Sequence, residues 1–285
     1  MPNPAADIFF QAARLNRQDP RRRGNVVHLE GGCQLLVSGD LHGNRAVLNK
    51  ILAYADLPHQ PDRRLVFQEI THGPPDPRSG QDRSIELLLR AARLKAEMPG
   101  QVLFVLANHD VAQITGSEIS KAGRRVCQSF ADGVHHAFGT DGREVLPAVE
   151  DFLLSLPLAI RCPNRVLVCH TLPDPARLEL AGTDILDRPY ELADLRRGGP
   201  VYEWTWGRNQ TPEEIDQLAA ALDVDFFVLA HKHIETGCEF LSPRALVVVS
   251  DDDHGGLLQF SVDDPLTGEN ALSCFKPSVA LGAAT

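Results

Sequence analysis

Side chains that bind metals recur along this chain, each directly after an apolar run. In chain order they belong to Asp40, His42, Glu69, Asn108, His109, His170, His231 and His233. Carboxylate oxygen and imidazole nitrogen are suitable ligands for Zn, Mn, Fe or Ni. One such side chain alone has little meaning, but their order after successive apolar runs is hard to explain by core packing. The pattern therefore predicts a metal site assembled from distant loops.

The spacing within these segments favours two ions. Side chains alternate along an extended segment, so Asp40 and His42 lie on the same side, and the same holds for His231 and His233. Each pair can hold one ion, and the carboxylate of Glu69 can bridge both. Two ions roughly 3.5–4 Å apart bind a shared hydroxide, which attacks phosphorus in line, together with two oxygens of a phosphoester. We therefore expect a metal-dependent phosphoester hydrolase.

His109 has a separate role in this chemistry. It follows Asn108, an expected ligand, and so faces the leaving group of a bound ester. A histidine in that place can give the leaving group a proton, while the ions neutralise the charge that develops on the equatorial oxygens. We interpret His109 as the general acid and the other seven side chains as metal ligands.

Alternating strands and helices must carry these loops. Apolar runs predict strands at 34–38, 65–70, 102–106, 166–169 and 226–229, with helices at 84–97 and 211–222. This alternation favours an α/β fold, in which sites form where loops leave the carboxyl ends of strands. Residues 114–152 look helical and irregular, and we expect them to cover the site.

The chain divides into one domain with two extensions. Residues 1–32 are polar and carry three arginines in succession, which indicates an N-terminal arm or short helix. Residues 33–276 form a single domain, closed by a pair of strands at 245–250 and 257–261. The small apolar residues near the end predict a flexible tail at 277–285.

The composition excludes several kinds of partner. Asp and Glu total 38 against 28 Lys and Arg, and the resulting formal charge of -10 disfavours nucleic acid. A phosphate site therefore needs local positive charge from metal ions or a few arginines. The apolar runs are too short for a bilayer and we find no signal peptide, so we expect no membrane partner. Six scattered cysteines fit a reducing compartment and a cytoplasmic protein.

These motifs resemble those of the calcineurin-like metallophosphoesterases. That family's pattern is G-D-x-H-G, then G-D-x-x-D-R-G, then G-N-H-[ED], then a lone His, then G-H-x-H or a related ending. Residues 39–43 match the first motif, and 107–110 match the third with Ala107 in place of glycine. His170 is similar to the lone histidine, and residues 230–233 are similar to the last motif.

Within that superfamily the chain is most similar to the serine/threonine phosphoprotein phosphatase branch. Residues 230–237 resemble its A-H-x-x-x-E-x-G segment, and 155–158 resemble its S-L-P-L segment. The resemblance covers about 34–261 and implies a central β-sandwich of mixed sheets flanked by helices. It also implies two metal ions, with Mn favoured over Fe, Zn or Ni, and removal of phosphate from a phosphoprotein or a small phosphoester.

The second motif departs from the family pattern. Glu69 stands where the family has a bridging Asp, and no carboxylate matches the second Asp, which orients the family's catalytic histidine. His72 stands in place of a phosphate-binding arginine, so we expect it to bind substrate. Arg208 resembles the branch's second phosphate-contacting arginine, with a substrate-binding and catalytic role. A competing alignment uses Asp82 and Arg83 after an insertion, although Asp82 then lies far from the strand end.

Three functions are consistent with this sequence. The first is a phosphomonoesterase similar to protein phosphatases. The second is a phosphohydrolase of nucleotides such as dinucleoside polyphosphates, which related bacterial proteins cleave. The third is a metal-binding sensor without turnover, which the altered second motif keeps open because fold alone does not determine activity.

Overall fold

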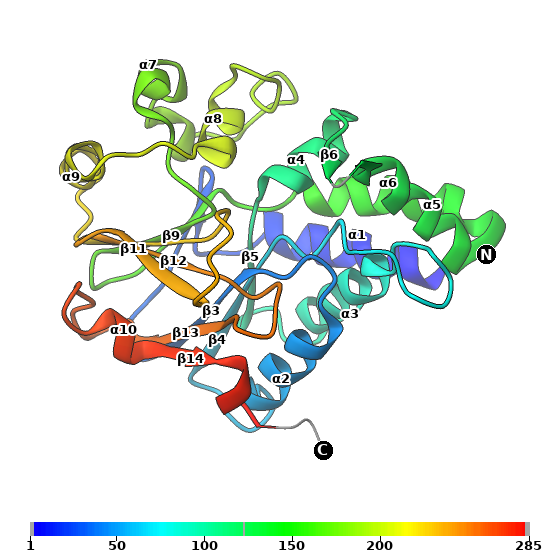
Figure 1. The fold of residues 1–285 in the computed structure, drawn as a ribbon, viewed down its shortest axis with the longest axis horizontal. Coiled ribbons are helices and arrows are strands. Elements are labelled where there is room, and N and C mark those ends of the chain that lie inside the picture. The colour runs from blue at the N-terminus through cyan, green and yellow to red at the C-terminus, as the bar shows by residue number, and fades with distance from the viewer. Residues whose placement is uncertain (1–2, 122, 283–285) are drawn as a thin grey trace.

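A five-stranded sheet carries the first three of the predicted site loops. The computed structural model describes residues 3–121 and 123–282. The sheet order is β14 (Phe275–Pro277), β13 (Gly256–Ser261), β3 (Gln34–Asp40), β4 (Arg63–Gln68) and β5 (Val102–Val105). Because β3, β4 and β5 are parallel, their carboxyl ends lie side by side and bring the loops that follow them together (Figure 1).

A seven-stranded sheet carries the other two loops. Its order is β1 (Arg22–Arg23), β2 (Val26–His28), β8 (Ala159–Arg161), β9 (Val166–Cys169), β10 (Phe226–Leu229), β12 (Ala245–Val248) and β11 (Cys238–Ser242). β9, β10 and β12 are parallel, so the residues that follow β9 and β10 emerge at the same edge. Strands β9 and β10 have the predicted bounds, and β3, β4 and β5 differ from theirs by one or two residues at their ends.

The two sheets face each other across an apolar layer. Leu35 and Val37 of β3 cluster there with Val168 and Val228 of the other sheet. Leu36, between them in sequence, belongs to the apolar cluster on the opposite face, as alternation along a strand requires. The predicted sandwich of mixed sheets flanked by helices is therefore confirmed.

Helices cover the outside of the sandwich (Figure 1). They are α1 (Pro4–Arg17), α2 (Arg45–Ala55), α3 (Ser84–Glu97), α4 (Asn108–Thr115), α5 (Val126–Phe138), α6 (Gly142–Leu153), α7 (Leu178–Ala181), α8 (Pro200–Trp206), α9 (Pro212–Leu222) and α10 (Ala271–Cys274). Phe104 of β5 packs edge-on against Phe152 of α6, with ring centroids 5.1 Å apart. The predicted helices 84–97 and 211–222 correspond to α3 and α9. In the described ranges no helix combines the length and the apolar content needed to cross a bilayer.

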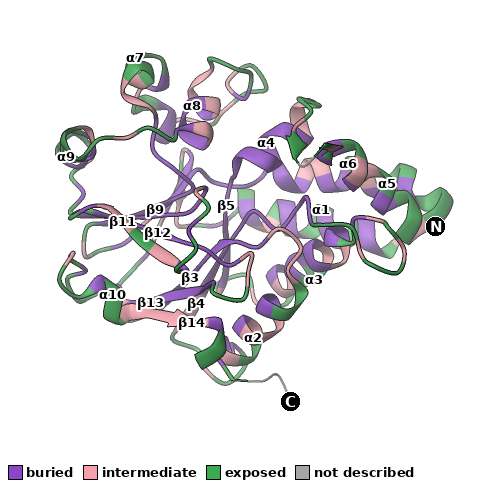
Figure 2. Cartoon of the chain, viewed as in Figure 1, coloured by how far each residue is buried: buried purple, intermediate pink, exposed green. Residues whose placement is uncertain are grey.

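The N-terminal residues pack closely on the rest of the chain. Helix α1 buries Phe9, Ala12 and Ala13 against α3 and α6, and its buried face is visible in Figure 2. Strand β2 then pairs with β8 and extends the seven-stranded sheet. The apolar positions of α1 recur at helical spacing, which gives the helix one face to bury. Residues 3–32 thus contribute a helix and two strands to the sandwich instead of a separate arm.

The C-terminal strands differ from the expected closing pair. β12 belongs to the seven-stranded sheet and β13 to the five-stranded sheet, where it pairs with β3 and β14. The connection between β12 and β13 therefore crosses from one sheet to the other. In the predicted tail, Pro277 ends β14, Ser278–Ala280 form a 3₁₀ helix and Leu281 is buried, while residues 283–285 lie outside the described ranges. Strand pairing depends on long-range contacts that short apolar patterns do not encode.

Candidate active site

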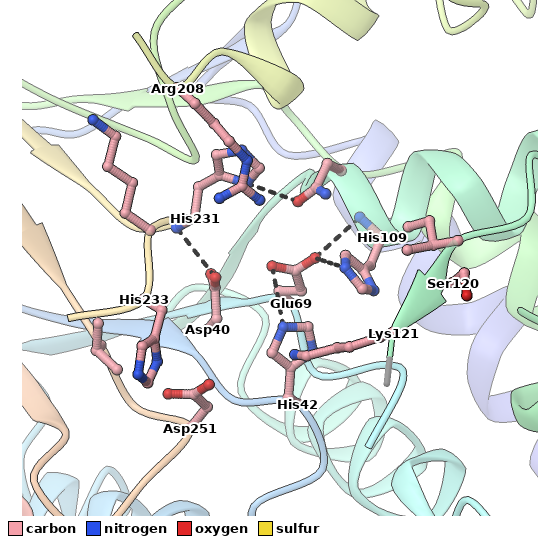
Figure 3. Close-up of a pocket in the computed structure, with 14 residues that line it drawn as sticks. Asp40, His42, Glu69, His109, Ser120, Lys121, Arg208, His231, His233 and Asp251 are labelled. Carbon is pink, nitrogen blue, oxygen red and sulfur yellow. Dashed lines mark hydrogen bonds and ion pairs between the residues drawn. The ribbon is translucent and has the colours of Figure 1, made fainter. Parts of the chain in front are cut away.

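The carboxyl ends of the strands open into a pocket of about 470 Å³. Figure 3 shows the side chains that line it: Asp40, His42, Glu69, Asn108, His109, Ile119, Ser120, Lys121, Arg208, His231, Lys232, His233, Val249 and Asp251. Eight side chains were predicted to bind metal or to act as the general acid, and seven of them line this pocket. The eighth, His170, is fully buried behind it. Five loops far apart in the sequence therefore converge on one place.

The loops reach the pocket through unusual backbone conformations. His42, Glu69 and His231 have φ of 40°, 42° and 70°, in the left-handed region that non-glycine residues rarely adopt. Such residues cost of order 1–3 kcal/mol each and cluster at functional sites. At Gly39, an added Cβ would lie 2.0 Å from the carbonyl oxygen of Val248, so only glycine lets β3 approach β12 this closely.

Glu69 lies between two groups of potential ligands (Figure 3). The first group is His42, Glu69 and His109, and the second is Asp40, Glu69 and His170; within each group the ligand atoms lie within 4.8 Å of one another. Glu69 Oε2 is 3.8 Å from His42 Nε2 and 3.5 Å from His170 Nε2. Glu69 Oε1 accepts a hydrogen bond from the backbone N–H of His109 at 3.0 Å. One carboxylate thus faces both groups.

Asn108, His170 and His231 form a compact cluster beside Asp40. Asn108 Oδ1 is 2.8 Å from His170 Nε2 and 3.0 Å from His231 Nδ1. Asp40 Oδ2 accepts the backbone N–H of His231 at 3.1 Å. Four atoms here are buried without a hydrogen-bond partner: Asp40 Oδ1, Asn108 Nδ2, His170 Nδ1 and His231 Nε2. Buried polar atoms are normally paired, so the unpartnered oxygen and ring nitrogens fit a site for cations.

The protonation states of these groups also fit cation binding. Burial raises the pKa of Asp40 to about 6. Burial and the neighbouring Asp40 carboxylate raise the pKa of Glu69 well above its ordinary value. Burial lowers the pKa of His42 and His231 to about 3 and that of His170 strongly, so these imidazoles are neutral at pH 7. Neutral imidazole is the form that binds metal, and a cation would offset the cost of the buried carboxylates.

A backbone carbonyl fixes the orientation of His42. Its Nδ1 lies 3.1 Å from the carbonyl oxygen of Thr71, which can only accept, so Nδ1 carries the hydrogen. The unprotonated Nε2 then faces Glu69. Metal-binding histidines commonly donate their other N–H to a carbonyl in this way. His42 therefore has the tautomer that a metal ligand needs.

His233 is placed differently from the sequence prediction. It is exposed and groups with Asp251 and Asp252 at the rim of the pocket, outside both groups around Glu69. The prediction assumed an extended backbone in which His231 and His233 point the same way. The left-handed φ at His231 breaks that alternation.

The alternative alignment of the second motif does not fit the structure. Asp82 Oδ1 accepts the backbone N–H of Ser84 at 2.8 Å, at the start of α3. The carboxylate of Asp82 belongs to neither group around Glu69. Glu69 therefore occupies the central place that the alternative gave to Asp82.

The two expected substrate-binding residues differ in position. His72 is 2 % exposed and lies behind the pocket, where its ring contacts His109 and Gln113. Counted from Glu69, residue 72 takes the place of the second Asp in the D-x-x-D-R spacing and not that of the arginine. With its φ of 60° and its buried side chain, the structure corrects the expectation that His72 binds substrate. Arg208 is an exposed residue that lines the pocket beside His231 (Figure 3). Its charge helps to lower the pKa of His231.

The pocket also contains two lysines that the sequence did not single out. Lys121 belongs to the hairpin of β6 (Ser120–Lys121) and β7 (Arg124–Arg125), and its side chain extends toward His42 (Figure 3). Lys232 lies between His231 and His233 in the sequence, and its proximity to that motif was a usable signal. For Lys121 there was none, because strands of two residues carry no detectable periodicity.

Known proteins resemble this chain over most of its length. The family model described as calcineurin-like phosphoesterase matches residues 34–235. A serine/threonine-protein phosphatase of Caenorhabditis elegans is 24% identical over 245 residues, which cover 81% of this chain and 49% of that protein. A probable serine/threonine-protein phosphatase of Encephalitozoon cuniculi is 26% identical over 197 residues, or 67% of this chain and 36% of that protein. The chain thus spans half or less of the length of these relatives.

Solved structures share the fold. A protein serine/threonine phosphatase from Saccharomyces cerevisiae superposes with a TM-score of 0.67 and 17% identity, over 90% of this chain and 81% of that one. A cold-active protein-tyrosine phosphatase from a psychrophilic Shewanella species superposes with a TM-score of 0.58 and 17% identity, over 87% and 79%. At this identity the similarity concerns the arrangement of the chain.

Proposed function

Because the chain belongs to the calcineurin-like phosphoesterase family, we propose that it is a metal-dependent phosphomonoesterase that acts on a phosphorylated protein or a small phosphoester. The observation that carries this proposal is the position of Glu69 between two groups of ligand atoms. A carboxylate shared in this way is suited to bridge a pair of cations. Core packing gives no reason for two buried carboxylates and several neutral imidazoles to meet at one point.

The side chains divide into two sets around Glu69. Asp40 and His42 would hold one ion, and Asn108, His170 and His231 would hold the other, with Glu69 common to both. A pair of divalent ions supplies Lewis acidity to phosphoryl oxygens and lowers the pKa of water so that it can act as a nucleophile. Mn is the ion that we propose first, since the carboxylate and amide oxygens suit it.

His109 is the residue that we propose to move a proton. Its Nε2 faces the pocket and lies 3.8 Å from Glu69 Oε1. Burial lowers its pKa strongly, so the ring by itself is neutral at pH 7. The negative charge of a bound phosphoryl group favours the protonated ring. His109 can then receive a proton at Nε2 and pass it to the oxygen of the leaving group.

Three cationic side chains at the pocket would bind the phosphoryl oxygens. Lys121, Arg208 and Lys232 all line it, although the chain as a whole has a formal charge of -10. This local positive charge is what a phosphate site in an acidic protein requires. A guanidinium group can hold two phosphoryl oxygens at once, whereas an ammonium group acts as a point charge. We therefore propose that Arg208 fixes the orientation of the substrate.

The names of the related proteins indicate the class of substrate. The two curated relatives are named serine/threonine-protein phosphatases, and one solved structure of similar fold is a protein-tyrosine phosphatase. Phosphate monoesters of hydroxyl side chains are common to all of these. We propose phosphorylated Ser, Thr or Tyr as the substrate class.

A substrate panel tests the proposal. Metal-free protein is supplemented with Mn and assayed on p-nitrophenyl phosphate, phosphoserine and phosphotyrosine peptides, a phosphodiester and a dinucleoside polyphosphate. We expect faster turnover of the monoesters than of the other two substrates. Preferred cleavage of the dinucleoside polyphosphate would replace this proposal with nucleotide hydrolysis. Metal binding without turnover of any ester would indicate a sensor.

The variant His109→Ala tests the assigned proton carrier. We expect kcat to fall by about 10²- to 10⁴-fold, the usual contribution of a positioned acid or base. Bound metal should be unchanged, because the ligands on both sides of Glu69 remain. His136→Ala, which removes an exposed histidine of α5, is the matched control and should have wild-type kcat. Equal activity of the two variants would remove His109 from the mechanism.

A further inference from the structure

His109, His72 and Gln113 form a line of hydrogen bonds that leads away from the pocket. His109 Nδ1 is 2.8 Å from His72 Nδ1, and His72 Nε2 is 3.0 Å from Gln113 Oε1. All three side chains are buried. The remaining ring nitrogen of His109, Nε2, is the one that faces Glu69 and the pocket. The line therefore begins at the reacting group and ends inside α4.

The amide oxygen at the inner end decides where the hydrogens lie. Gln113 Oε1 can only accept, so His72 must donate from Nε2. Burial lowers the pKa of His72 to about 4, so its ring is neutral at pH 7 and its Nδ1 has no hydrogen. His72 Nδ1 then accepts, and His109 must donate from Nδ1. As a result His109 Nε2 keeps its lone pair toward the pocket.

Packing prevents the rings from leaving this arrangement. The ring of Phe130, which is fully buried, meets the His72 ring edge-on at 5.7 Å and 71°. The His109 ring lies between those of His42 and His72, with centroids 4.8 Å and 5.0 Å away. In the part of the chain that the structure describes, the His109 side chain has one hydrogen-bond partner, His72. Loss of that partner would leave the His109 ring without a defined tautomer.

We propose that His72 and Gln113 are positioning residues, which hold His109 in the tautomer and ring orientation that leave its Nε2 free for a proton of the reaction. This inference rests on the proposed function, in which His109 carries the proton. Neither residue touches the pocket, so both act through His109. Gln113 has this role because its oxygen sets the direction of every hydrogen bond in the line.

Nitrogen-15 NMR of the metal-free protein with labelled histidine tests the tautomers directly. We expect His109 to be protonated at Nδ1 and His72 at Nε2, with signals assigned from His109→Ala and His72→Asn. Gln113→Glu keeps an acceptor and should preserve both tautomers at a pH where His72 remains neutral. Gln113→Met has no acceptor and should give mixed tautomers. Protonation of His109 at Nε2 in the wild type, or unchanged tautomers in Gln113→Met, would overturn the proposal.

Kinetics on a phosphomonoester provide the second test. Asn tolerates the left-handed backbone of residue 72 and places an acceptor oxygen near the position of the imidazole Nδ1. We expect His72→Leu to lower kcat by about 10- to 100-fold with little change in KM, and His72→Asn to recover most of that loss. Gln113→Met should lower kcat as well. An equal loss in His72→Asn and His72→Leu, or a change confined to KM, would contradict a positioning role.

The Gln113 pair keeps the test valid if His72→Leu does not fold, since neither Gln113 variant alters the left-handed residue. The proposed function and the positioning role of His72 and Gln113 can be refuted separately. Absence of turnover by the wild-type protein would overturn the proposed function. The tautomers are measured without metal or substrate, so they test the line of hydrogen bonds independently of turnover.

Discussion

Replacing Glu69 with Gln should remove the stabilisation that metal ions give, while leaving the metal-free protein at least as stable as the wild type. The amide has the shape of the carboxylate, and its oxygen can still accept the backbone N–H of His109. A carboxyl group whose pKa is raised by folding destabilises the folded state at any pH above its unfolded value. Removing that charge therefore removes this destabilisation of the folded state when no metal is bound.

The size of the metal effect follows from linkage. An ion present at 100 times its dissociation constant stabilises the folded state by about 2.7 kcal/mol, so two ions contribute about 5.4 kcal/mol. A chain of 285 residues has an unfolding entropy of about 0.6 kcal/mol per degree at about 2.1 cal/mol/K per residue. Saturation with both ions should thus raise the Tm of the wild type by about 9 °C. Glu69 belongs to both ligand groups, so Glu69→Gln should lose most of this rise.

Calorimetry with EDTA and with excess Mn measures both effects. Glu97→Gln, the same change at an exposed position of α3, is the control and should keep the full rise. A Tm rise in Glu69→Gln equal to that of the control would refute the assignment of Glu69 as the shared ligand. Absence of any rise in the wild type would refute metal binding itself.

Three further predictions concern the rim and the core. Lys121→Ala should lower kcat/KM for a phosphomonoester by about tenfold, or about 1.4 kcal/mol. The control is Arg143→Ala on the exposed face of α6, and equal kcat/KM in the two variants would exclude Lys121 from the phosphate site. Gly39→Ala should lower the free energy of unfolding in urea by about 3 kcal/mol or more, because the new Cβ meets the backbone of β12, whereas Gly100→Ala, with open space around it, should change it little. Burial lowers the pKa of Lys95 from 10.5 to about 8. The cost of burying its charged ammonium group therefore applies fully below pH 8 and decreases as pH rises toward 10.5. The stability of the wild type relative to Lys95→Met should therefore rise by up to about 3 kcal/mol over that range, and parallel pH profiles would contradict it.

The strands that carry the site could be read from the sequence. Each of β3, β4, β5, β9 and β10 contains a continuous apolar run, because both of its faces are buried there, and each is followed by a polar loop. Helix α9 lies within one residue of the predicted 211–222, since Thr211 and Glu214 form a capping box at its start. Elements with strong local sequence signals of this kind are found in the structure where they were predicted.

Features set by long-range contacts could not be read in this way. The pairing of β13 with β3 instead of β12 depends on which sheet the chain enters after residue 249, and no local pattern specifies it. The buried position of His72 and the rim position of His233 accompany left-handed backbone at His72 and His231, which is uncommon for residues other than glycine. Lys121 enters the pocket on a hairpin whose strands are too short to leave a pattern.

The proposed function requires that one carboxylate joins two cations in a pocket built from five strand ends. Crystals grown with Mn and measured at wavelengths on both sides of its absorption edge test this most directly. We expect two anomalous peaks roughly 3.5–4 Å apart, both beside the Glu69 carboxylate, with His170 and His231 at one and His42 at the other. A single peak held by His233, Asp251 and Asp252 at the rim, or none beside Glu69, would contradict it.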